Sequence, residues 1–259
     1  MSVMSHATVA RPSAPSRTLA LASTVKLPRS AGSGGSFGAG SAASAAVLAC
    51  EDIVVELARR MNASPDELVL ADGRASAGGR DATLVELLRG EAIEAMGKSS
   101  PGAQAKKTSQ ASHGAHFAEV AVNAVTGEVR VRRMLGVFDV GRVLNRATAA
   151  NQIVGGMVWG VSYALGEAAV VDTRSGRFVN PDFGEYHVAV NADVPQIECH
   201  FIEEIDDAAN QAGAKGVGEL GISGAGAAVV NAIYNATGIR VRDYPLTLDK
   251  YLDQMPDIA

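Results

Sequence analysis

The stretch Asn210-Gln-Ala-Gly-Ala-Lys-Gly-Val-Gly-Glu-Leu-Gly-Ile-Ser-Gly-Ala-Gly226 decides how the rest of the chain is interpreted, because it places six glycines around a single carboxylate, Glu219. A glycine loop that runs into a helix start brings backbone N–H groups close to a ligand. A single acid held there is a candidate general base. The alternative is a tight turn with a solvated glutamate, because short glycine motifs often occur by chance.

The residues after this loop predict a helix that ends at Gly238, in the place that a C-cap glycine takes. Its apolar face would consist of Ala227, Val230, Ile233 and Tyr234. The loop also contains Gly216-x-Gly218-x-x-Gly221, the spacing of the dinucleotide-binding fingerprint. That fingerprint should close the first strand of a βαβ unit, but here it lies near the last residue, without room for the strands that should follow. Nucleotide binding is therefore the less favoured hypothesis.

Lys215-Gly-Val-Gly-Glu219, the helix after it and Gly238-Ile-Arg-Val-Arg-Asp-Tyr-Pro-Leu-Thr247 together resemble the C-terminal end of the molybdenum-binding subunit of the xanthine dehydrogenase/aldehyde oxidase family. Several earlier stretches fit the same family in the same order, which is far more specific than any one of them. They are Ala31-Gly-Ser-Gly-Gly-Ser-Phe-Gly38, Ala115-His-Phe-Ala-Glu-Val-Ala-Val122, Thr126-Gly-Glu-Val-Arg-Val131, Phe138-Asp-Val-Gly-Arg142 and Asn151-Gln-Ile-Val-Gly-Gly156. Leu220-Gly221 replaces the two prolines that many members have after the glutamate, which is similar to the bacterial aldehyde-oxidising branch.

The resemblance covers about residues 27–255 and implies an α+β fold, the C-terminal half of a molybdenum-cofactor-binding domain. We therefore expect residues 27–259 to form this part of the domain, after a disordered, non-homologous tail at residues 1–26. The implied reaction is oxidation of an aldehyde to a carboxylic acid with water as the oxygen source, and Glu219 would be the base. A xanthine- or purine-type substrate is the alternative within the family. A truncated, inactive remnant or a cofactor-binding module is the non-enzymatic alternative.

The cofactor that the resemblance implies is molybdenum bound to molybdopterin, in the cytosine dinucleotide form, and no side chain of this chain would bind the metal directly. The implied cofactor-binding residues are Gly34, Gly35, Ser36, Phe37, Gly38, Gln152, Lys215, Gly216, Val217 and Gly218. From the residues alone, the loop 28–40 ahead of a predicted helix at 41–61 is either an anion cradle or a flexible linker. The resemblance favours the cradle, because the family's loop contacts a cofactor that carries phosphates.

The composition limits the classes of partner. A net charge of −5 gives no reason to expect nucleic acid or an anionic membrane, and no apolar run approaches the roughly 18 residues of a membrane span. Cys50 and Cys199 are far apart and offer neither a disulfide framework nor an iron–sulfur site. The resemblance therefore implies that electrons leave through a separate [2Fe–2S] subunit and an FAD subunit. It implies a cytoplasmic enzyme, or a periplasmic one exported through a partner's signal.

Residues 1–26 are basic, rich in serine and alanine, and free of acids. This composition fits a transit-type peptide, whereas a secretory signal needs a longer apolar core than residues 19–25 provide. A third hypothesis is that the segment is foreign to the fold, because the resemblance begins abruptly near Leu27-Pro28. That hypothesis predicts a truncated or frame-altered product with a disordered tail.

Two features in the middle of the chain bear on the site. His113 and His116 have metal-ligand spacing, but the residues after them alternate like a strand, where positions three apart face opposite sides and cannot readily share a metal. A hairpin turn is predicted at Thr126-Gly127, and a long helix after Asn145 contains glycines 155, 156 and 160. Each glycine costs about 1 kcal/mol relative to alanine, which predicts close approach of another helix or a ligand. Strands are predicted around residues 170–179 and at 196–205.

Overall fold

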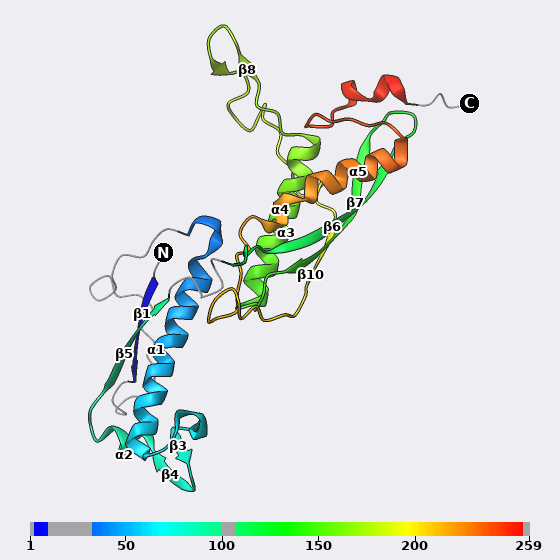
Figure 1. The fold of residues 1–259 in the computed structure, drawn as a ribbon. Helices are drawn as coiled ribbons and strands as arrows, with labels where there is room; N and C mark the ends of the chain where they lie inside the picture. The colour runs from blue at the N-terminus through cyan, green and yellow to red at the C-terminus, as the bar shows by residue number, and fades with distance from the viewer. Residues whose placement is uncertain (1–2, 10–32, 100–106, 256–259) are drawn as a thin grey trace. The chain divides into compact units, whose positions relative to one another are not determined.

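The computed structural model describes residues 3–9, 33–99 and 107–255, and Figure 1 shows its helices and strands in chain order. The chain separates into two compact units, each of which is described by itself. The first unit contains the residues up to Gln110 together with Ile205–Lys215, and the second contains Ala111–Glu204 and the residues from Gly216 onward. Helices and strands occur in both units, in agreement with the predicted α+β class. Nowhere in the described ranges is a helix long and apolar enough to cross a membrane.

Helix α1 (Gly38–Met61) is the scaffold of the first unit. It begins three residues before the predicted start and ends at Asn62, which has the left-handed conformation of a C-cap. Its buried face packs against helix α2 (Leu84–Leu88) and strand β5 (Ile93–Ser99). The shared core consists of Ala49, Ile53, Leu57, Leu88 and Ile93.

Gly97 allows β5 to lie against α1, because a Cβ at this position would lie 2.6 Å from the backbone nitrogen of Ala49. A short antiparallel sheet in the order β2-β3-β4 covers the end of the same unit. Its strands are β2 (Val69–Ala71), β3 (Arg74–Ala77) and β4 (Arg80–Thr83), and the 3-10 helix η2 (Pro65–Glu67) precedes them. Another 3-10 helix, η1 (Gly34–Ser36), lies directly before α1.

Strand β1 (Val3–Val9) pairs antiparallel with β5, with Val3 opposite Ser99 and Val9 opposite Ile93. The sequence predicted disorder for residues 1–26, and for these seven residues the structure differs. The prediction considered apolar periodicity alone, whereas an edge strand offers unpaired N–H and C=O groups to any extended segment. Residues 1–2 and 10–26 lie outside the described residues, and there the prediction is not tested.

Three strands form the sheet of the second unit, in the order β10-β7-β6. Strands β6 (His113–Val122) and β7 (Val129–Asp139) are the predicted antiparallel hairpin around Thr126-Gly127. Strand β10 (Gln196–Phe201) lies parallel to β7 on its other side and ends earlier than the predicted 205. Strands β8 (Val171–Asp172) and β9 (Arg177–Phe178) form a separate hairpin at the predicted turn.

Three helices accompany this sheet: α3 (Arg146–Leu165), α4 (Leu220–Ser223) and α5 (Ala225–Thr237). Helix α3 begins at Asn145, whose side chain accepts a hydrogen bond of 3.1 Å from the backbone N–H of Thr148. Helix α5 ends at Gly238 with φ of 75°, which confirms the predicted C-cap. The 3-10 helices η3 (Leu248–Lys250) and η4 (Leu252–Gln254) follow.

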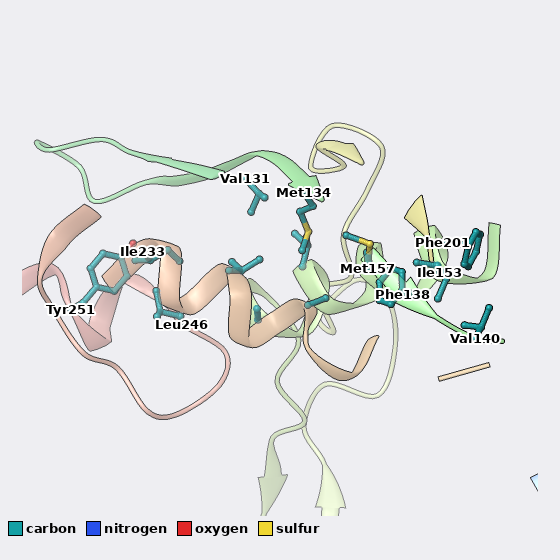
Figure 2. Packing of buried hydrophobic residues seen from close by; sticks show 14 residues of the cluster. Val131, Met134, Phe138, Val140, Ile153, Met157, Phe201, Ile233, Leu246 and Tyr251 are labelled. Atoms are coloured by element: carbon teal, nitrogen blue, oxygen red, sulfur yellow. The ribbon is translucent and has the colours of Figure 1, made fainter. Parts of the chain in front are cut away.

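The main core of the second unit is formed by α3, α5 and β7 together with the segment after α5. Figure 2 shows its side chains spread from Tyr251 near one end of α5 to Phe201 and Val140 beyond the other end. The Tyr251 hydroxyl donates to the carbonyl of Gly127, which ties this segment to the β6–β7 turn. The largest fully buried side chains of this core are Phe138, Met134, Ile153, Met157, Ile233, Val140 and Val229.

The buried face of α5 differs from the predicted one. Val229 and Ile233 are buried, whereas Ala227 and Tyr234 are exposed. The prediction placed the start of the apolar face at Ala227. Burial is instead set by Ala225, whose side chain packs directly on α3, so the whole face is rotated.

The glycines of α3 have different surroundings. A Cβ at Gly156 would lie 2.8 Å from the backbone nitrogen of Ile222 in α4, and one at Gly160 would collide with the side chain of Ala225 in α5. The predicted close approach of another helix is therefore confirmed at these two positions. A Cβ at Gly155 would meet nothing within 4 Å, so helix packing gives no reason for a glycine there.

Candidate functional site

Glu219 stands at the N-cap position of α4, and its side chain is exposed. Its carboxylate makes no capping hydrogen bond to the helix. The backbone around it is well held: the N–H of Leu220 donates to the carbonyl of Val217 across 3.1 Å, and the Ser223 hydroxyl donates to the carbonyl of Glu219 itself across 2.8 Å. The structure therefore combines a fixed main chain with a side chain that can take part in chemistry.

The glycine loop before Glu219 is held by side chains from other elements. Gln152 of α3 donates from Nε2 to the carbonyl oxygen of Gly218 across 2.7 Å. The Ser112 hydroxyl donates to the carbonyl of Gly216. These bonds occupy backbone acceptors on the loop, and they bring together two of the predicted cofactor-binding residues, Gln152 and Gly218, beside Glu219.

The third glycine of the fingerprint has a packing role. A Cβ at Gly221 would collide with the carbonyl oxygen of Ile153 in α3, so only glycine allows α4 to lie this close. Within the described ranges, no β-strand ends directly before Gly216. The strand–turn–helix context that a dinucleotide fingerprint requires is therefore missing.

A cavity of about 610 Å³ opens beside Glu219. Its walls come from the first half of α3, from the end of the glycine loop and from α4. The lining residues are Asn151, Gln152, Gly155, Gly156, Trp159, Gly218, Glu219, Ile222 and Ser223. Glu219 therefore lines the same cavity as two of the predicted cofactor-binding residues, Gln152 and Gly218.

The chemistry of this lining fits a polar organic cofactor. The amides of Asn151 and Gln152 can both donate and accept hydrogen bonds, as the edge of a pterin ring requires. Gly155 leaves open space in the wall, which a side chain would fill. The lining offers neither a thiolate nor an imidazole, so the donor set suits a cofactor that brings its own ligands for the metal.

Sequence reasoning missed four lining residues: Asn151, Trp159, Ile222 and Ser223. The helical spacing contained a signal for Trp159, because Gln152, Gly155 and Trp159 follow the pattern i, i+3, i+7 and so share one face of α3. Trp159 is 59% exposed, an unusual environment for the only tryptophan of the chain.

The predicted loop Gly34–Gly38 lies in the first unit, directly before α1. Gly35 and Ser36 have φ of 65° and 61°, in the left-handed region that serine rarely adopts. Ser33 Oγ accepts a hydrogen bond of 3.1 Å from the N–H of Gly38 and occupies the space that a Cβ there would need. The loop is thus a tight turn on the N-terminus of a 24-residue helix, a setting that favours anions. Its contact with a cofactor stays a prediction.

Lys215, the last residue of the first unit, points to a carboxylate of the same unit. Its Nζ lies 3.4 Å from Asp206 Oδ2, and its side chain is only 9% exposed. Next to this pair, Asn210 Nδ2 donates to the carbonyl of Ala214 across 2.7 Å. The buried Ser44 of α1 donates to Asn210 Oδ1. These contacts give Lys215 a structural role, and its predicted cofactor contact is not tested.

The two histidines of the H-x-x-H pattern have separate partners. His113 Nδ1 lies 3.4 Å from Asp139 Oδ2, whereas His116 Nε2 is bonded to the carbonyl of Gly221. Both lie on strand β6, which confirms the strand that the alternation predicted. Within the described ranges, no group of three histidine, cysteine or acidic side chains is arranged to hold a metal ion.

Comparison with known proteins identifies the family to which this chain is similar. The molybdopterin cofactor-binding domain family matches residues 18–195 of the chain. The aldehyde oxidoreductase molybdenum-binding subunit PaoC of Escherichia coli (strain K12) is 46% identical over 232 residues, which are 90% of this chain and 32% of that protein. The xanthine dehydrogenase molybdenum-binding subunit of Escherichia coli O157:H7 is 31% identical over 211 residues, 79% of this chain and 28% of that protein.

Among solved structures, quinoline 2-oxidoreductase from Pseudomonas putida 86 shares the fold with a TM-score of 0.67 and 22% identity, over 87% of this chain and 30% of that chain. Fold and sequence together define a molybdopterin cofactor-binding domain. The chain belongs to the xanthine dehydrogenase/aldehyde oxidase family, as part of its molybdenum-binding subunit, which confirms the resemblance found in the sequence. It spans about a third of the length of the relatives that it matches.

Proposed function

We propose that this chain forms part of a molybdenum hydroxylase that oxidises aldehydes to carboxylic acids, and that Glu219 is its general base. One observation carries the proposal: an exposed carboxylate extends from a backbone that Gln152 and Ser223 hold at the wall of a cavity that also contains the amides of Asn151 and Gln152. The relative at 46% identity is named as an aldehyde oxidoreductase subunit, which supports this substrate class over a purine.

The chemistry requires one water molecule for each aldehyde. Conversion of RCHO and H₂O to RCOOH releases two protons and two electrons. A molybdenum cofactor, when bound, would supply the two-electron acceptor and the water-derived oxygen. The part of Glu219 is to accept, on a carboxylate oxygen, the proton that this oxygen must lose before it can bond to the carbonyl carbon.

A base of this kind must stay within hydrogen-bond reach of the oxygen that it deprotonates. Gln152 and Ser223 serve this need, because they hold the carbonyls of Gly218 and Glu219 on either side of the Glu219 Cα. Gln152 has a second capacity, since its amide oxygen can accept a hydrogen bond from a pterin N–H. The backbone of Gly216, Val217 and Gly218 would border the metal, and the loop Gly34–Gly38 would face the phosphates.

The proposal also concerns partners. The described part of the chain offers Cys50 and Cys199 as isolated thiols, so the electrons would leave through a [2Fe–2S] subunit and an FAD subunit. The nucleotide form of the pterin would be the cytosine dinucleotide, and the assembled enzyme would work in the cytoplasm. These assignments follow from the bacterial aldehyde-oxidising branch of the family.

The test is Glu219→Gln in the enzyme assembled with its partner subunits. The substitution keeps the size of the side chain and removes the base, so kcat should fall by about 10²–10⁴-fold while the molybdenum content stays at the wild-type level. Glu128→Gln, an exposed glutamate at the β6–β7 turn, is the matched control and should keep the wild-type rate. A Glu219→Gln enzyme with more than about a tenth of the wild-type kcat would return Glu219 to an ordinary loop carboxylate.

A second candidate function is cofactor binding without turnover. It is favoured by the exposure of Glu219 and Trp159 at the cavity, because a site open to water holds a cofactor less tightly. The 259-residue chain purified alone should then contain clearly less than one molybdenum per chain and show no aldehyde oxidation. Stoichiometric molybdenum with turnover in the isolated chain would rule this candidate out.

A further inference from the structure

His116 reaches the short helix that begins directly after Glu219. It lies on β6, and its Nε2 is 3.0 Å from the carbonyl oxygen of Gly221, two residues beyond Glu219. A carbonyl oxygen can only accept, so Nε2 carries the hydrogen and donates it. In the neutral imidazole, Nδ1 then carries no hydrogen, and this one bond fixes the role of each ring nitrogen.

The imidazole also fills a defined space. A Cβ at Gly224 would lie 2.5 Å from Nδ1 and 3.2 Å from Cε1, so the ring lies directly over this glycine. Phe138 contacts the ring edge to face, with centroids 5.0 Å apart and an interplanar angle of 73°. Burial lowers the pKa of His116, although the hydrogen bond with the Gly221 carbonyl opposes this effect. The neutral, Nε2-protonated form is therefore the one that the site holds at neutral pH.

Glu219 consequently lies between two anchors from different elements. On one side, Gln152 of α3 holds the carbonyl of Gly218. On the other side, His116 of β6 holds the carbonyl of Gly221. Neither side chain is bonded to the Glu219 carboxylate. Gln152 holds the peptide group directly before the Glu219 Cα, whereas His116 holds the peptide group after Gly221, inside the short helix α4 that Glu219 caps.

We infer that His116 is a positioning residue for Glu219: the hydrogen bond from His116 Nε2 to the Gly221 carbonyl fixes the start of α4 and thereby the direction in which the carboxylate enters the cavity. The inference rests on the proposed function, because it takes Glu219 as the base. It also gives the H-x-x-H pattern a role that its spacing did not predict, since only His116 shares the inward-facing side of β6 with Ala118 and Val120.

The experiment compares four variants in the assembled enzyme. His116→Gln keeps an N–H donor near the position of Nε2, whereas the shorter His116→Asn cannot reach Gly221. His116→Phe refills the space over Gly224 without a donor. His113→Gln is the matched control, because it makes the same change three residues earlier on β6, at an exposed side chain.

We expect His116→Asn and His116→Phe to lower kcat by about 10- to 100-fold, the scale of loss when a reacting group is misplaced by up to about 1 Å. KM and molybdenum content should stay unchanged, and His116→Gln should recover most of the rate. Hydrogen–deuterium exchange gives a readout that does not depend on turnover: the amides of residues 218–224 should exchange faster in His116→Asn and His116→Phe, which have no donor within reach of Gly221, than in His116→Gln or His113→Gln.

Combination with Glu219→Gln separates this inference from the proposed function. If His116 acts through Glu219, then His116→Asn should cause no further loss of kcat in a Glu219→Gln background. The role of His116 would be overturned if His116→Asn and His116→Phe both kept the wild-type kcat. It would also be overturned if His116→Asn lowered kcat as much in the Glu219→Gln background as in the wild type. A Glu219→Gln enzyme that keeps its rate would overturn the proposed function instead.

Discussion

Ser44 and Asn210 lie 166 residues apart in the chain and share a hydrogen bond of 3.1 Å from Oγ to Oδ1. Ser44 is fully buried on α1, and its hydroxyl oxygen also accepts a bond of 3.2 Å from the N–H of Ala212. One small side chain thus connects the scaffold helix of the first unit to the segment that leads into the glycine loop. Because the buried Ser44 hydroxyl has two hydrogen-bond partners, its removal should affect the stability of the folded chain.

We expect Ser44→Ala to lower the free energy of unfolding by about 1–3 kcal/mol, because Ala212 and Asn210 each lose this buried partner. Urea unfolding of the purified chain at 25 °C measures the change. Ser64→Ala is the control: Ser64 is exposed and makes no side-chain cap bond at η2, so its loss should stay within about 0.5 kcal/mol. Equal stabilities for the two variants would show that the Ser44 bond contributes little.

Gly155 and Gly156 are consecutive in α3, and we expect alanine substitutions at the two positions to change the free energy of unfolding in opposite directions. Alanine at Gly155 meets open space and should raise the free energy of unfolding by up to about 1 kcal/mol through helix propensity. Alanine at Gly156 would press on the backbone of Ile222 in α4 and should lower it by about 1–3 kcal/mol. Thermal unfolding of the pair, side by side, checks the sign of each change, and two changes of the same sign would contradict the packing described for α3 and α4.

His116 predicts a pH dependence of stability. Burial lowers its pKa below the ordinary value of 6.5. Above that pH it is neutral in both the folded and the unfolded chain, and its contribution to stability is complete. As the pH falls below 6.5, the unfolded chain binds a proton first, so the free energy of unfolding falls until the pH has passed through the folded pKa.

His116→Gln should remove this part of the acid-side loss, which urea unfolding at a series of pH values between about 8 and 5 would measure. His113→Gln makes the same substitution three residues earlier on the same strand and is the reference variant. An identical slope in wild type and His116→Gln would mean that the folded site accepts the proton as easily as the unfolded chain does.

Local patterns predicted the elements of this fold well, because their signals lie within a few residues. The end of α5 at Gly238 and the β6–β7 hairpin were both predicted from short motifs. The parallel pairing of β10 with β7 was not predicted, since no short-range pattern specifies which distant strand is a partner. The rotated face of α5 has the same origin: contact of Ala225 with α3 decides it.

The site shows a similar division. Glu219 was singled out from the glycine loop around it and Gln152 through resemblance, and the structure brings them together at one cavity. The difference between Gly155 and Gly156 was invisible in the sequence, because it depends on where α4 lies. His116 was assigned to ordinary packing, since its partner, the carbonyl of Gly221, is a backbone atom 105 residues away that no residue type marks.

The division of the first unit into two stretches of chain has a consequence for synthesis. The ribosome makes β6, β7, α3 and β10 before it reaches Ile205–Lys215, which the first unit also contains. Domains usually fold in order as they emerge, beginning at the N-terminus. Here Ser44 must wait for Asn210, 166 residues later, and at roughly 5–20 residues per second that interval lasts on the order of 10–30 s. The nascent chain therefore carries an unfinished first unit through the translation of most of the second: the core that α1 shares with α2 and β5 is already made, whereas Ser44 still waits for Asn210 and Ala212.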